Sequence, residues 1–136
     1  ELKSISQTEK DFIEEKNELY DLFDLHDKKQ LYFNEASLGN RKKAALSGAL
    51  ICNPDLIIID EPTNGLDLRT QTRLFNYLNN RLRNGSSILS ATHSPDFIEK
   101  TGTHKGICLI KGESKICSSK EEIFEKVAEL KSATYS

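Results

Sequence analysis

The sequence predicts an α/β fold, in which a parallel sheet is flanked by helices. Leu56–Ile59 is apolar at every position, which is typical of a strand buried on both faces of a parallel sheet. A second strand is expected over Ser87–Thr92, and the stretch between the two has the length and pattern of one crossover helix. The two strands should therefore lie parallel through a right-handed crossover, with their carboxyl ends at the same edge of the sheet.

The segment before the first strand is expected to be helical. From residue 8 to about residue 24 apolar side chains recur at the spacings of an amphipathic helix, whose buried face would be formed by Phe12, Ile13, Leu19, Tyr20 and Phe23. Residues 25–36 are polar and irregular, as in a connector or a short helix. Ser37 is a suitable N-cap for a helix that reaches about Ile51, and Asn53-Pro54 ends it, because proline cannot continue a helix. We therefore expect residues 1–53 to form a helical subdomain.

The remaining chain, residues 54–136, is expected to form the α/β part. Pro62–Gly65 is a turn, Asp67 is a suitable N-cap for a helix to about Asn84, and Gly85 stands where a left-handed residue commonly ends a helix. The segments that follow are a short helix from Pro95, a hairpin of Ile107–Ile110 and Lys115–Cys117 around a turn at Lys111-Gly112-Glu113, and a final helix from Ser119 to about Lys131.

Length, charge and hydropathy exclude several classes of protein. At 136 residues and 15.4 kDa the chain has the length of one compact domain. The 19 Lys and Arg against 21 Asp and Glu give a formal net charge of −2. This charge argues against a nucleic-acid partner and against non-specific binding to an anionic membrane. No apolar stretch approaches the roughly 18 residues that a membrane span needs, and no signal-peptide pattern opens the chain.

The three cysteines, Cys52, Cys108 and Cys117, form no Cys-x-x-Cys pair and no cluster with histidine. They are expected to be buried, small apolar residues in a reducing cytosol rather than zinc ligands or disulfide partners. The sequence contains no Met and opens with Glu1-Leu2-Lys3. Because a cytosolic chain starts with Met, we expect this one to be a piece of something longer.

The strongest local signal for chemistry is Asp60-Glu61, which directly follows the first predicted strand. In open α/β sheets ligands bind at the carboxyl ends of the strands, where these two carboxylates are expected. Pro62 should hold Glu61 extended and so direct its side chain away from that of Asp60. In the functional interpretation, one carboxylate serves a hydrated Mg²⁺ ion and the other orients a water molecule or accepts its proton. The alternative is a solvated Asp-Glu turn.

His93 favours the functional interpretation of these carboxylates. It follows Glu61 by 32 residues and stands immediately after the second predicted strand. One strand–helix–strand unit takes about 30 residues, so the crossover should return His93 to the edge at which Glu61 lies. A lone histidine is more often structural, whereas a histidine beside an Asp-Glu pair at neighbouring strand ends is typical of an active site.

The order of these motifs resembles the second half of an ABC-type ATPase, the nucleotide-binding subunit of ATP-binding-cassette transporters. Residues 56–64 (Leu-Ile-Ile-Ile-Asp-Glu-Pro-Thr-Asn) resemble the Walker B strand and its turn, and Gly65-Leu66-Asp67 resembles the D-loop. Ala91-Thr92-His93-Ser94 is similar to the switch-histidine loop, and residues 36–43 occupy the place of the signature sequence Leu-Ser-Gly-Gly-Gln. The resemblance implies the C-terminal part of a P-loop NTPase fold, with the hairpin and a helix at its end.

The resemblance also implies a role for each motif residue. Asp60 would hold Mg²⁺ through water, Glu61 would be the catalytic base for the attacking water, and His93 would contact the γ-phosphate of ATP. Asp67 would link two subunits of a dimer. The residues that would meet the γ-phosphate of ATP held by the opposite subunit are Ser37, Leu38, Gly39 and Asn40. A helix N-terminus with a hydroxyl and closely approaching N–H groups is physically suited to bind an anion.

Three departures from the family pattern affect these expectations. Leu38 stands where the signature has glycine and Asn40 where it has glutamine, so a reshaped phosphate contact is expected at Leu38, whose Cβ restricts the approach of backbone. No Gly-x-x-x-x-Gly-Lys-Ser/Thr loop (Walker A) occurs, and without it the chain has neither a cradle of N–H groups nor a lysine for the β-phosphate. We therefore expect ATPase activity in the full-length protein and none in this fragment alone.

Three functions are compatible with these motifs. The first is the ATP-hydrolysing subunit of an ABC transporter, with ATP and Mg²⁺ as cofactors. Its partners would be a transmembrane permease and a second ATPase subunit in a homodimer, at the cytoplasmic, inner face of the cell membrane. The form of residues 62–67 resembles that of exporters. The second is a soluble ABC ATPase without a transporter, although translation-type members usually have histidine where Gly65 stands. The third is a non-catalytic interaction module, because the phosphate-binding loop is missing from this sequence.

Overall fold

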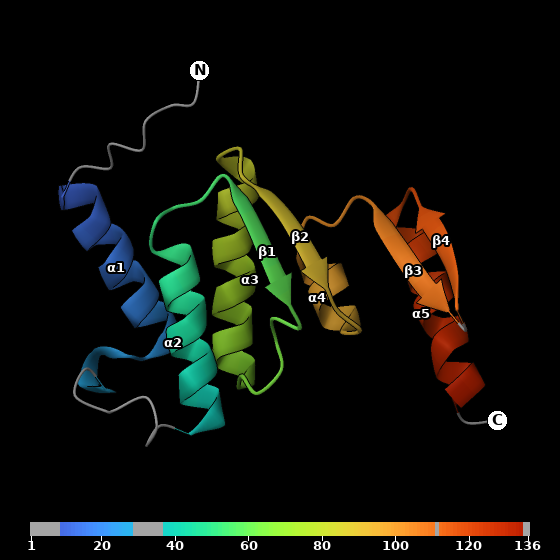
Figure 1. Cartoon of the computed structure of the whole chain (residues 1–136), viewed down its shortest axis with the longest axis horizontal. Coiled ribbons are helices and arrows are strands. Elements are labelled where there is room, and N and C mark those ends of the chain that lie inside the picture. The colour runs from blue at the N-terminus through green and yellow to red at the C-terminus, as the bar shows by residue number, and fades with distance from the viewer. Residues whose placement is uncertain (1–8, 29–36, 111, 135–136) are drawn as a thin grey trace.

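The computed structural model describes the chain outside residues 1–8, 29–36, 111 and 135–136, so Ala36 and Lys111 of the predicted motifs lie outside the described residues. The elements in chain order are α1 (Glu9–Phe23), a 3₁₀ turn (His26–Lys28), α2 (Leu38–Leu50), β1 (Leu56–Asp60), α3 (Leu68–Arg83), β2 (Ser87–Ala91), α4 (Pro95–Lys100), β3 (Gly106–Ile110), β4 (Glu113–Cys117) and α5 (Lys120–Thr134). The predicted order of helices and strands is confirmed over this part of the chain (Figure 1). None of these helices is long and apolar enough to cross a membrane.

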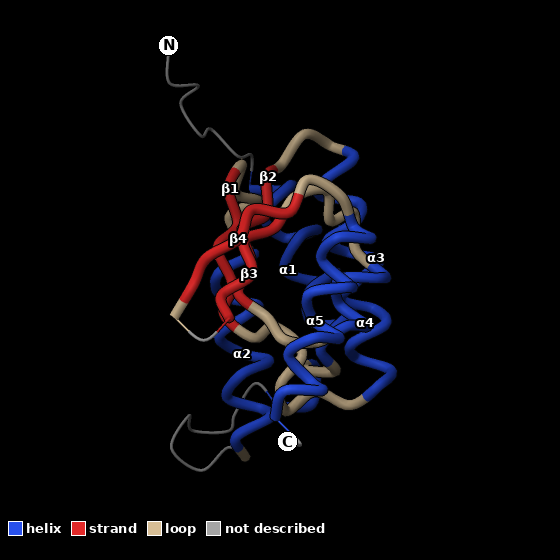
Figure 2. Tube along the Cα trace, turned by 90° about the vertical axis from the view of Figure 1, so that its right-hand side faces the viewer, coloured by secondary structure: helices blue, strands red, loops and turns tan. Residues whose placement is uncertain are grey.

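Two small sheets form the strand layer. β1 and β2 pair in parallel, from Leu56 opposite Ser87 to Asp60 opposite Ala91, and α3 connects them. β3 and β4 pair antiparallel in the terminal hairpin. Helices α3, α4 and α5 lie on one side of the strands (Figure 2). The predicted parallel pair and the predicted hairpin are therefore both confirmed.

β1 is buried on one face only, so the expected burial of this strand on both faces is wrong. Ile57 and Ile59 are 4% and 8% exposed, whereas Leu56 and Ile58 are 56% and 70% exposed. Side chains alternate between the two faces of a strand, and the described helices cover only the face that carries Ile57 and Ile59. The apolar side chains on the uncovered faces of the strands, here called the exposed apolar face, are Leu56, Ile58, Leu89, Ile107, Leu109 and Ile116.

Both predicted N-caps are in place. Ser37 precedes α2, and its hydroxyl oxygen accepts a hydrogen bond from the Asn40 N–H at 3.3 Å. Asp67 precedes α3, and its carboxylate accepts one from the Thr70 N–H at 2.9 Å. Gly85 follows the end of α3 at φ +96°, the left-handed conformation expected there. Local residues therefore determine where α2 and α3 start and where α3 ends.

The main hydrophobic core lies between α1, α2, α3 and the inner face of β1. Its most deeply buried side chains are Leu19, Phe23, Leu50, Leu74 and Leu78. The apolar face predicted for α1 is buried only in its second half, since Phe12 and Ile13 are 39% and 45% exposed, and that part of the prediction is wrong. The second half of α1 is the part that enters the main core, through Leu19, Leu22 and Phe23, and the Tyr77 hydroxyl of α3 donates to the Glu15 carboxylate beside it.

The three cysteines differ in their surroundings. Cys108 and Cys117 are buried beneath the hairpin against Ile123 of α5, and their free thiol sulfurs lie 3.6 Å apart. Burial, together with the contact to Cys117, raises the pKa of the Cys108 thiol. Cys52 is exposed, so its expected burial is wrong: it lies in the turn that leads from α2 to Pro54, away from the core.

Candidate functional site

The carboxyl ends of β1 and β2 bring Glu61, Thr92 and His93 together. The Glu61 N–H donates to the Ala91 carbonyl oxygen at 2.9 Å, which continues the pairing of the two strands. Glu61 Oε1 and His93 Nδ1 lie 2.5 Å apart, and the Thr92 hydroxyl donates to Glu61 Oε2 at 3.4 Å. The side chain of His93 is 79% exposed and that of Glu61 is 26% exposed. A carboxylate held by two neighbours, beside an accessible imidazole, is suited to proton transfer.

The backbone of Glu61 is left-handed, with φ +42°, so the extended conformation expected from the following Pro62 is wrong. The Glu61 carbonyl oxygen accepts a hydrogen bond from the Asn64 N–H at 3.2 Å, which closes a turn directly after β1. For a residue with a Cβ this conformation costs on the order of 1–2 kcal/mol. Strained residues of this kind concentrate at functional sites, where the surrounding contacts hold them in place.

Asp60 is the last residue of β1, and it lies on the strand face opposite to Ile59. Among the described residues, no group of three or more His, Cys, Asp or Glu side chains is placed to hold a metal ion. A single exposed carboxylate still suits Mg²⁺, which keeps several waters and takes further oxygen ligands from substrate phosphates. The residue type and exposure of Asp60 are thus compatible with one ligand of a hydrated Mg²⁺ ion whose other ligands are not protein side chains.

The first turn of α2, which carries the signature-like residues, lies against the loop that follows β1. A Cβ on Gly39 would meet the Gly65 carbonyl oxygen at 3.0 Å, so the two backbones are in close contact. The Ser37 hydroxyl caps the helix through the Asn40 N–H, and Leu38 is 75% exposed. The structure thus places these four signature-like residues beside the loop that follows β1 of the same chain. The side chain of Leu38 is turned to solvent.

Lys42, Lys43 and Thr92 contact the candidate site. They lie within the motif-like segments 36–43 and 91–94, but no role was expected for them. Lys42 Nζ donates to the Glu61 carbonyl oxygen, and Lys43 Nζ lies 3.2 Å from Asp67 Oδ2. The place of the two lysines in segment 36–43 does not reveal their partners, because their contacts join residues 19 and 24 positions apart. Thr92 carries a weak signal, its place directly before His93 at the end of β2.

Asp67 is engaged within its own chain. Its carboxylate accepts from the Thr70 N–H at 2.9 Å and from the Thr70 hydroxyl at 2.8 Å, and the Lys43 ammonium lies 3.2 Å away. The hydrogen bond from the Thr70 N–H, then that from its hydroxyl, and then Lys43 hold the pKa of Asp67 well below its usual range. Asp67 therefore ties the first turn of α3 to α2.

Replacing Asp67 by alanine is expected to lower the free energy of unfolding by about 0.5–2 kcal/mol at neutral pH, the range for loss of a helix N-cap. Because the folded pKa is depressed, this stabilisation is present above the unfolded value of about 3.9 and is lost as the pH falls through the folded value. Urea unfolding of both proteins across the acid range measures the difference. The gap should shrink below about pH 4, and a gap that stays constant contradicts this account of Asp67.

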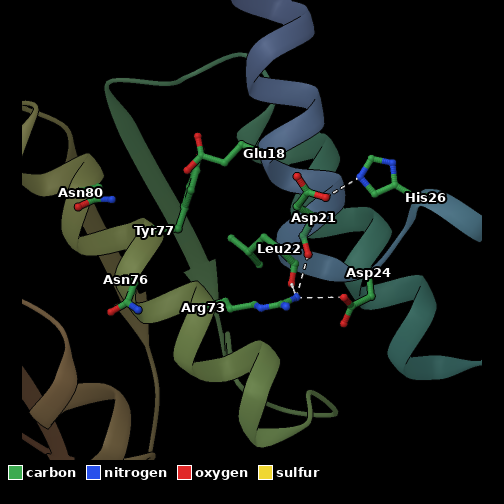
Figure 3. A pocket seen from close by; sticks show the side chains of 9 residues that line it. All are labelled: Glu18, Asp21, Leu22, Asp24, His26, Arg73, Asn76, Tyr77 and Asn80. Atoms are coloured by element: carbon green, nitrogen blue, oxygen red, sulfur yellow. Dashed lines mark hydrogen bonds and ion pairs between the residues drawn. The ribbon is translucent and has the colours of Figure 1, made fainter.

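A separate groove of about 490 Å³ lies between α1 and α3 (Figure 3). Arg73 of α3 reaches across it and donates to the Asp21 carbonyl oxygen at 2.9 Å and to Asp24 Oδ1 at 3.0 Å, so it binds the end of α1. Burial is the main cause that raises the pKa of Glu18 and of Tyr77 in the lining. The groove contains none of the strand-end residues, and its contacts serve the packing of α1 on α3.

Comparison with known sequences places this geometry in a family. The family model described as "AAA domain, putative AbiEii toxin, Type IV TA system" matches residues 2–99. The chain is similar to the methionine import ATP-binding protein MetN 1 of Staphylococcus epidermidis, with 31% identity over 122 residues that cover 88% of this chain and 36% of that protein. It is also similar to the Nod factor export ATP-binding protein I of Cupriavidus pinatubonensis, with 35% identity over 86 residues that cover 63% of this chain and 26% of that protein.

Solved structures show the same fold. The ATP-binding cassette MJ1267 of an ABC transporter matches with a TM-score of 0.63 and 22% identity, over 95% of this chain and 51% of that one. The ADP conformation of the same cassette matches with a TM-score of 0.60 and 23% identity, over 94% and 52%. The fold is thus that of part of an ATP-binding cassette domain. The chain spans less than half the length of the curated relatives named above and about half of this solved domain.

Proposed function

Because the chain belongs to the family of AAA-type ATPase domains and folds like part of an ABC ATPase domain, we propose that it supplies the hydrolytic part of an ATP-hydrolysing domain. The observation that carries this proposal is the contact between Glu61 Oε1 and His93 Nδ1, 2.5 Å apart at the ends of two neighbouring parallel strands. In this proposal Glu61 accepts a proton from the attacking water, and His93 contacts the γ-phosphate of ATP.

The position of Glu61 supports its role as the base. His93 and Thr92 each hold one oxygen of the carboxylate, so the group needs little reorganisation when it takes up a proton. As the water oxygen bonds to the γ-phosphorus, the bond from that phosphorus to the β–γ bridging oxygen breaks and ADP leaves. One proton of the water passes to Glu61, while His93 orients the carboxylate. Asp60 would hold Mg²⁺, which when bound supplies charge neutralisation for the phosphates. In this proposal the residue that accepts the proton, Glu61, and the residue that contacts the phosphate, His93, follow two adjacent strands of the sheet.

The hydrolytic part requires a second part that holds the nucleotide. The sequence contains no phosphate-binding Gly-x-x-x-x-Gly-Lys-Ser/Thr loop, and the chain covers about half of the solved domain that it matches. The exposed apolar face supports a second part as well, because large exposed apolar surfaces mark places where other polypeptide packs. We therefore propose that the phosphate-binding loop belongs to a stretch of polypeptide that packs on the exposed apolar face.

The first turn of α2 supports an assembly of two such domains. The N-terminus of a 13-residue helix attracts anions, and here it carries the Ser37 hydroxyl and the closely packed Gly39. We propose that Ser37, Leu38, Gly39 and Asn40 meet the γ-phosphate of ATP on a second ATPase subunit, with Asp67 at the contact between subunits. The assembly would serve a membrane permease from the cytoplasmic side. Relatives named for import and for export match at 31% and 35% identity, so they favour neither direction of transport.

A soluble ATPase without a permease is the second candidate. The observation that favours it is the matching family model, whose description names a toxin–antitoxin system and no transporter. Purification of the full-length protein from membrane and cytosolic fractions separates the two candidates. Copurification with a membrane permease supports the transporter subunit, and an active ATPase recovered from the cytosol without a permease supports the soluble enzyme.

The 136-residue chain alone is expected to bind ATP weakly or not at all, because it lacks the cradle of backbone N–H groups that holds the β-phosphate. Titration calorimetry with ATP and Mg²⁺ measures this. The control is the assembled ATPase, defined here as this chain joined to an amino-terminal ABC ATPase half that carries the phosphate-binding loop. The assembled ATPase should bind ATP, and tight binding by the chain alone would refute the division of the domain into these two parts.

A further inference from the structure

Lys42 of α2 reaches the backbone of Glu61 rather than a carboxylate. Its ammonium donates a hydrogen bond to the Glu61 carbonyl oxygen, between two half-buried residues 19 positions apart. The Asp60 and Glu61 carboxylates lie next to this carbonyl in the sequence, yet the contact is made to the backbone. We propose that Lys42 is a positioning residue: it holds the left-handed backbone of Glu61 that directs the carboxylate toward His93. This inference rests on the proposed function and adds a residue to that site.

The conformation of Glu61 needs such a holding contact. A φ of +42° is disfavoured for a residue with a Cβ, and the following Pro62 favours an extended conformation instead. Three hydrogen bonds oppose this preference. The Glu61 N–H donates to Ala91 at 2.9 Å, and the Glu61 carbonyl oxygen accepts from Asn64 at 3.2 Å and from Lys42. Of these three partners, Lys42 is the one on a helix, so it connects the turn to a rigid element.

The neighbouring contacts show that α2 and the loop after β1 are joined at several points. Lys43 Nζ lies 3.2 Å from Asp67 Oδ2 at the far end of the loop. Between these two lysine contacts, the backbone of Gly39 lies directly against the Gly65 carbonyl oxygen. The signature-like turn and the candidate base are therefore connected within one chain, and Lys42 is the connection that reaches the base itself.

Amide hydrogen exchange of the 136-residue chain tests the contact without any assay of activity. In Lys42→Met we expect the Glu61 and Asn64 N–H groups to exchange about tenfold faster or more, the factor for loss of one hydrogen bond to a charged group. The amide of the buried Leu78 should keep its rate. Lys42→Arg should restore protection, and the exposed Lys105→Met is the control that should change nothing. Unchanged exchange at Glu61 and Asn64 in Lys42→Met would overturn the proposal.

A glycine background separates positioning from simple anchoring of the loop. Glycine adopts φ values near +42° without a steric cost, so in Glu61→Gly the backbone no longer needs Lys42 to hold it. The Lys42→Met change should therefore accelerate Asn64 exchange clearly less in the Glu61→Gly background than in the wild-type chain. An equal acceleration in both backgrounds would show that Lys42 only anchors the loop, and it would overturn the positioning role.

Kinetics of the assembled ATPase test whether the contact between Lys42 and the Glu61 carbonyl oxygen affects ATP turnover. Lys42→Met should lower kcat about tenfold or more and leave the KM for ATP unchanged, because the nucleotide is held elsewhere while the base is misplaced. Lys42→Arg should keep most of the activity, and Lys105→Met all of it. If Lys42→Met accelerates amide exchange at Glu61 and Asn64 but keeps a normal kcat, the proposal that Lys42 positions the Glu61 carboxylate is contradicted. Failure of the proposed function is seen separately, as normal turnover in Glu61→Gln, and it leaves the exchange result intact.

Discussion

Replacing Glu61 by glutamine in the assembled ATPase is expected to lower the steady-state rate of ATP hydrolysis by about 10²–10⁴-fold, the contribution of a positioned general base. Glutamine has nearly the same shape, and its amide oxygen still accepts a hydrogen bond from His93 or Thr92, so the turn after β1 should remain folded. It cannot take a proton from the attacking water. Phosphate release under excess ATP measures the rate, and calorimetry checks that ATP binding is retained.

The matched control is Glu113→Gln on the hairpin, an exposed glutamate far along the chain from the candidate site. This variant should hydrolyse ATP at the wild-type rate. If Glu61→Gln binds ATP and also keeps normal turnover, Glu61 is not the base, and the contact between its carboxylate and His93 serves only the structure of the turn.

Replacing Leu78 by alanine is expected to lower the free energy of unfolding by about 2–5 kcal/mol, the range for truncating a buried leucine. Leu78 is 0% exposed and lies in the middle of α3, inside the main core. The cost combines the lost burial of its methyl groups with the cavity left among side chains that relax only partly. Urea unfolding of the 136-residue chain, followed by circular dichroism, measures the change.

Leu56→Ala provides the control, because it makes the same substitution at a side chain that is 56% exposed on the exposed apolar face. In the chain alone this change should cost less than about 1 kcal/mol, since little apolar surface returns to water. In the assembled ATPase the cost at Leu56 should rise, because the second part of the domain is proposed to cover that face. Equal costs at Leu56 with and without the second part would contradict the proposed packing.

The helix boundaries could be predicted from the sequence because neighbouring residues determine them. Ser37 and Asp67 cap α2 and α3 through N–H groups three residues away, and Gly85 accepts the left-handed conformation after α3. The pairing of β1 with β2 was predictable for a related reason, since a single helix between two strands commonly forms a crossover that returns the second strand parallel to the first. The same reasoning brought His93 to Glu61.

The errors in the prediction arise where distant residues decide the outcome. The apolar run Leu56–Ile59 was expected to be buried on both faces, but the described helices cover one face only. The preference of the residue before a proline is overridden at Glu61 by a hydrogen bond that its N–H donates to Ala91 and by hydrogen bonds that its carbonyl oxygen accepts from Asn64 and Lys42; Ala91 and Lys42 lie far from Glu61 in the sequence. Interactions of this kind leave no periodic pattern in the sequence.

The candidate site also contains residues that the sequence predicts and residues whose role only the fold reveals. Asp60, Glu61 and His93 could be found because strand ends in an α/β sheet are where ligands bind. Lys42 and Lys43 lie in the signature-like segment, but their roles could not be predicted, because lysines near the start of a helix ordinarily face solvent and only the fold shows their contacts with Glu61 and Asp67. Exposure of Cys52 likewise follows from its place in the turn after α2 rather than from its residue type.

The central claim is that this chain holds the hydrolytic part of an ATPase whose nucleotide-binding part lies outside these 136 residues. An experiment that mixes the two parts tests this claim most directly. The 136-residue chain and a separate amino-terminal ABC ATPase half with the phosphate-binding loop are assayed for phosphate release alone and together. Hydrolysis should occur only in the mixture and should disappear when the chain carries Glu61→Gln. Hydrolysis by the chain alone, or a folded mixture that binds ATP and releases no phosphate, would contradict the claim.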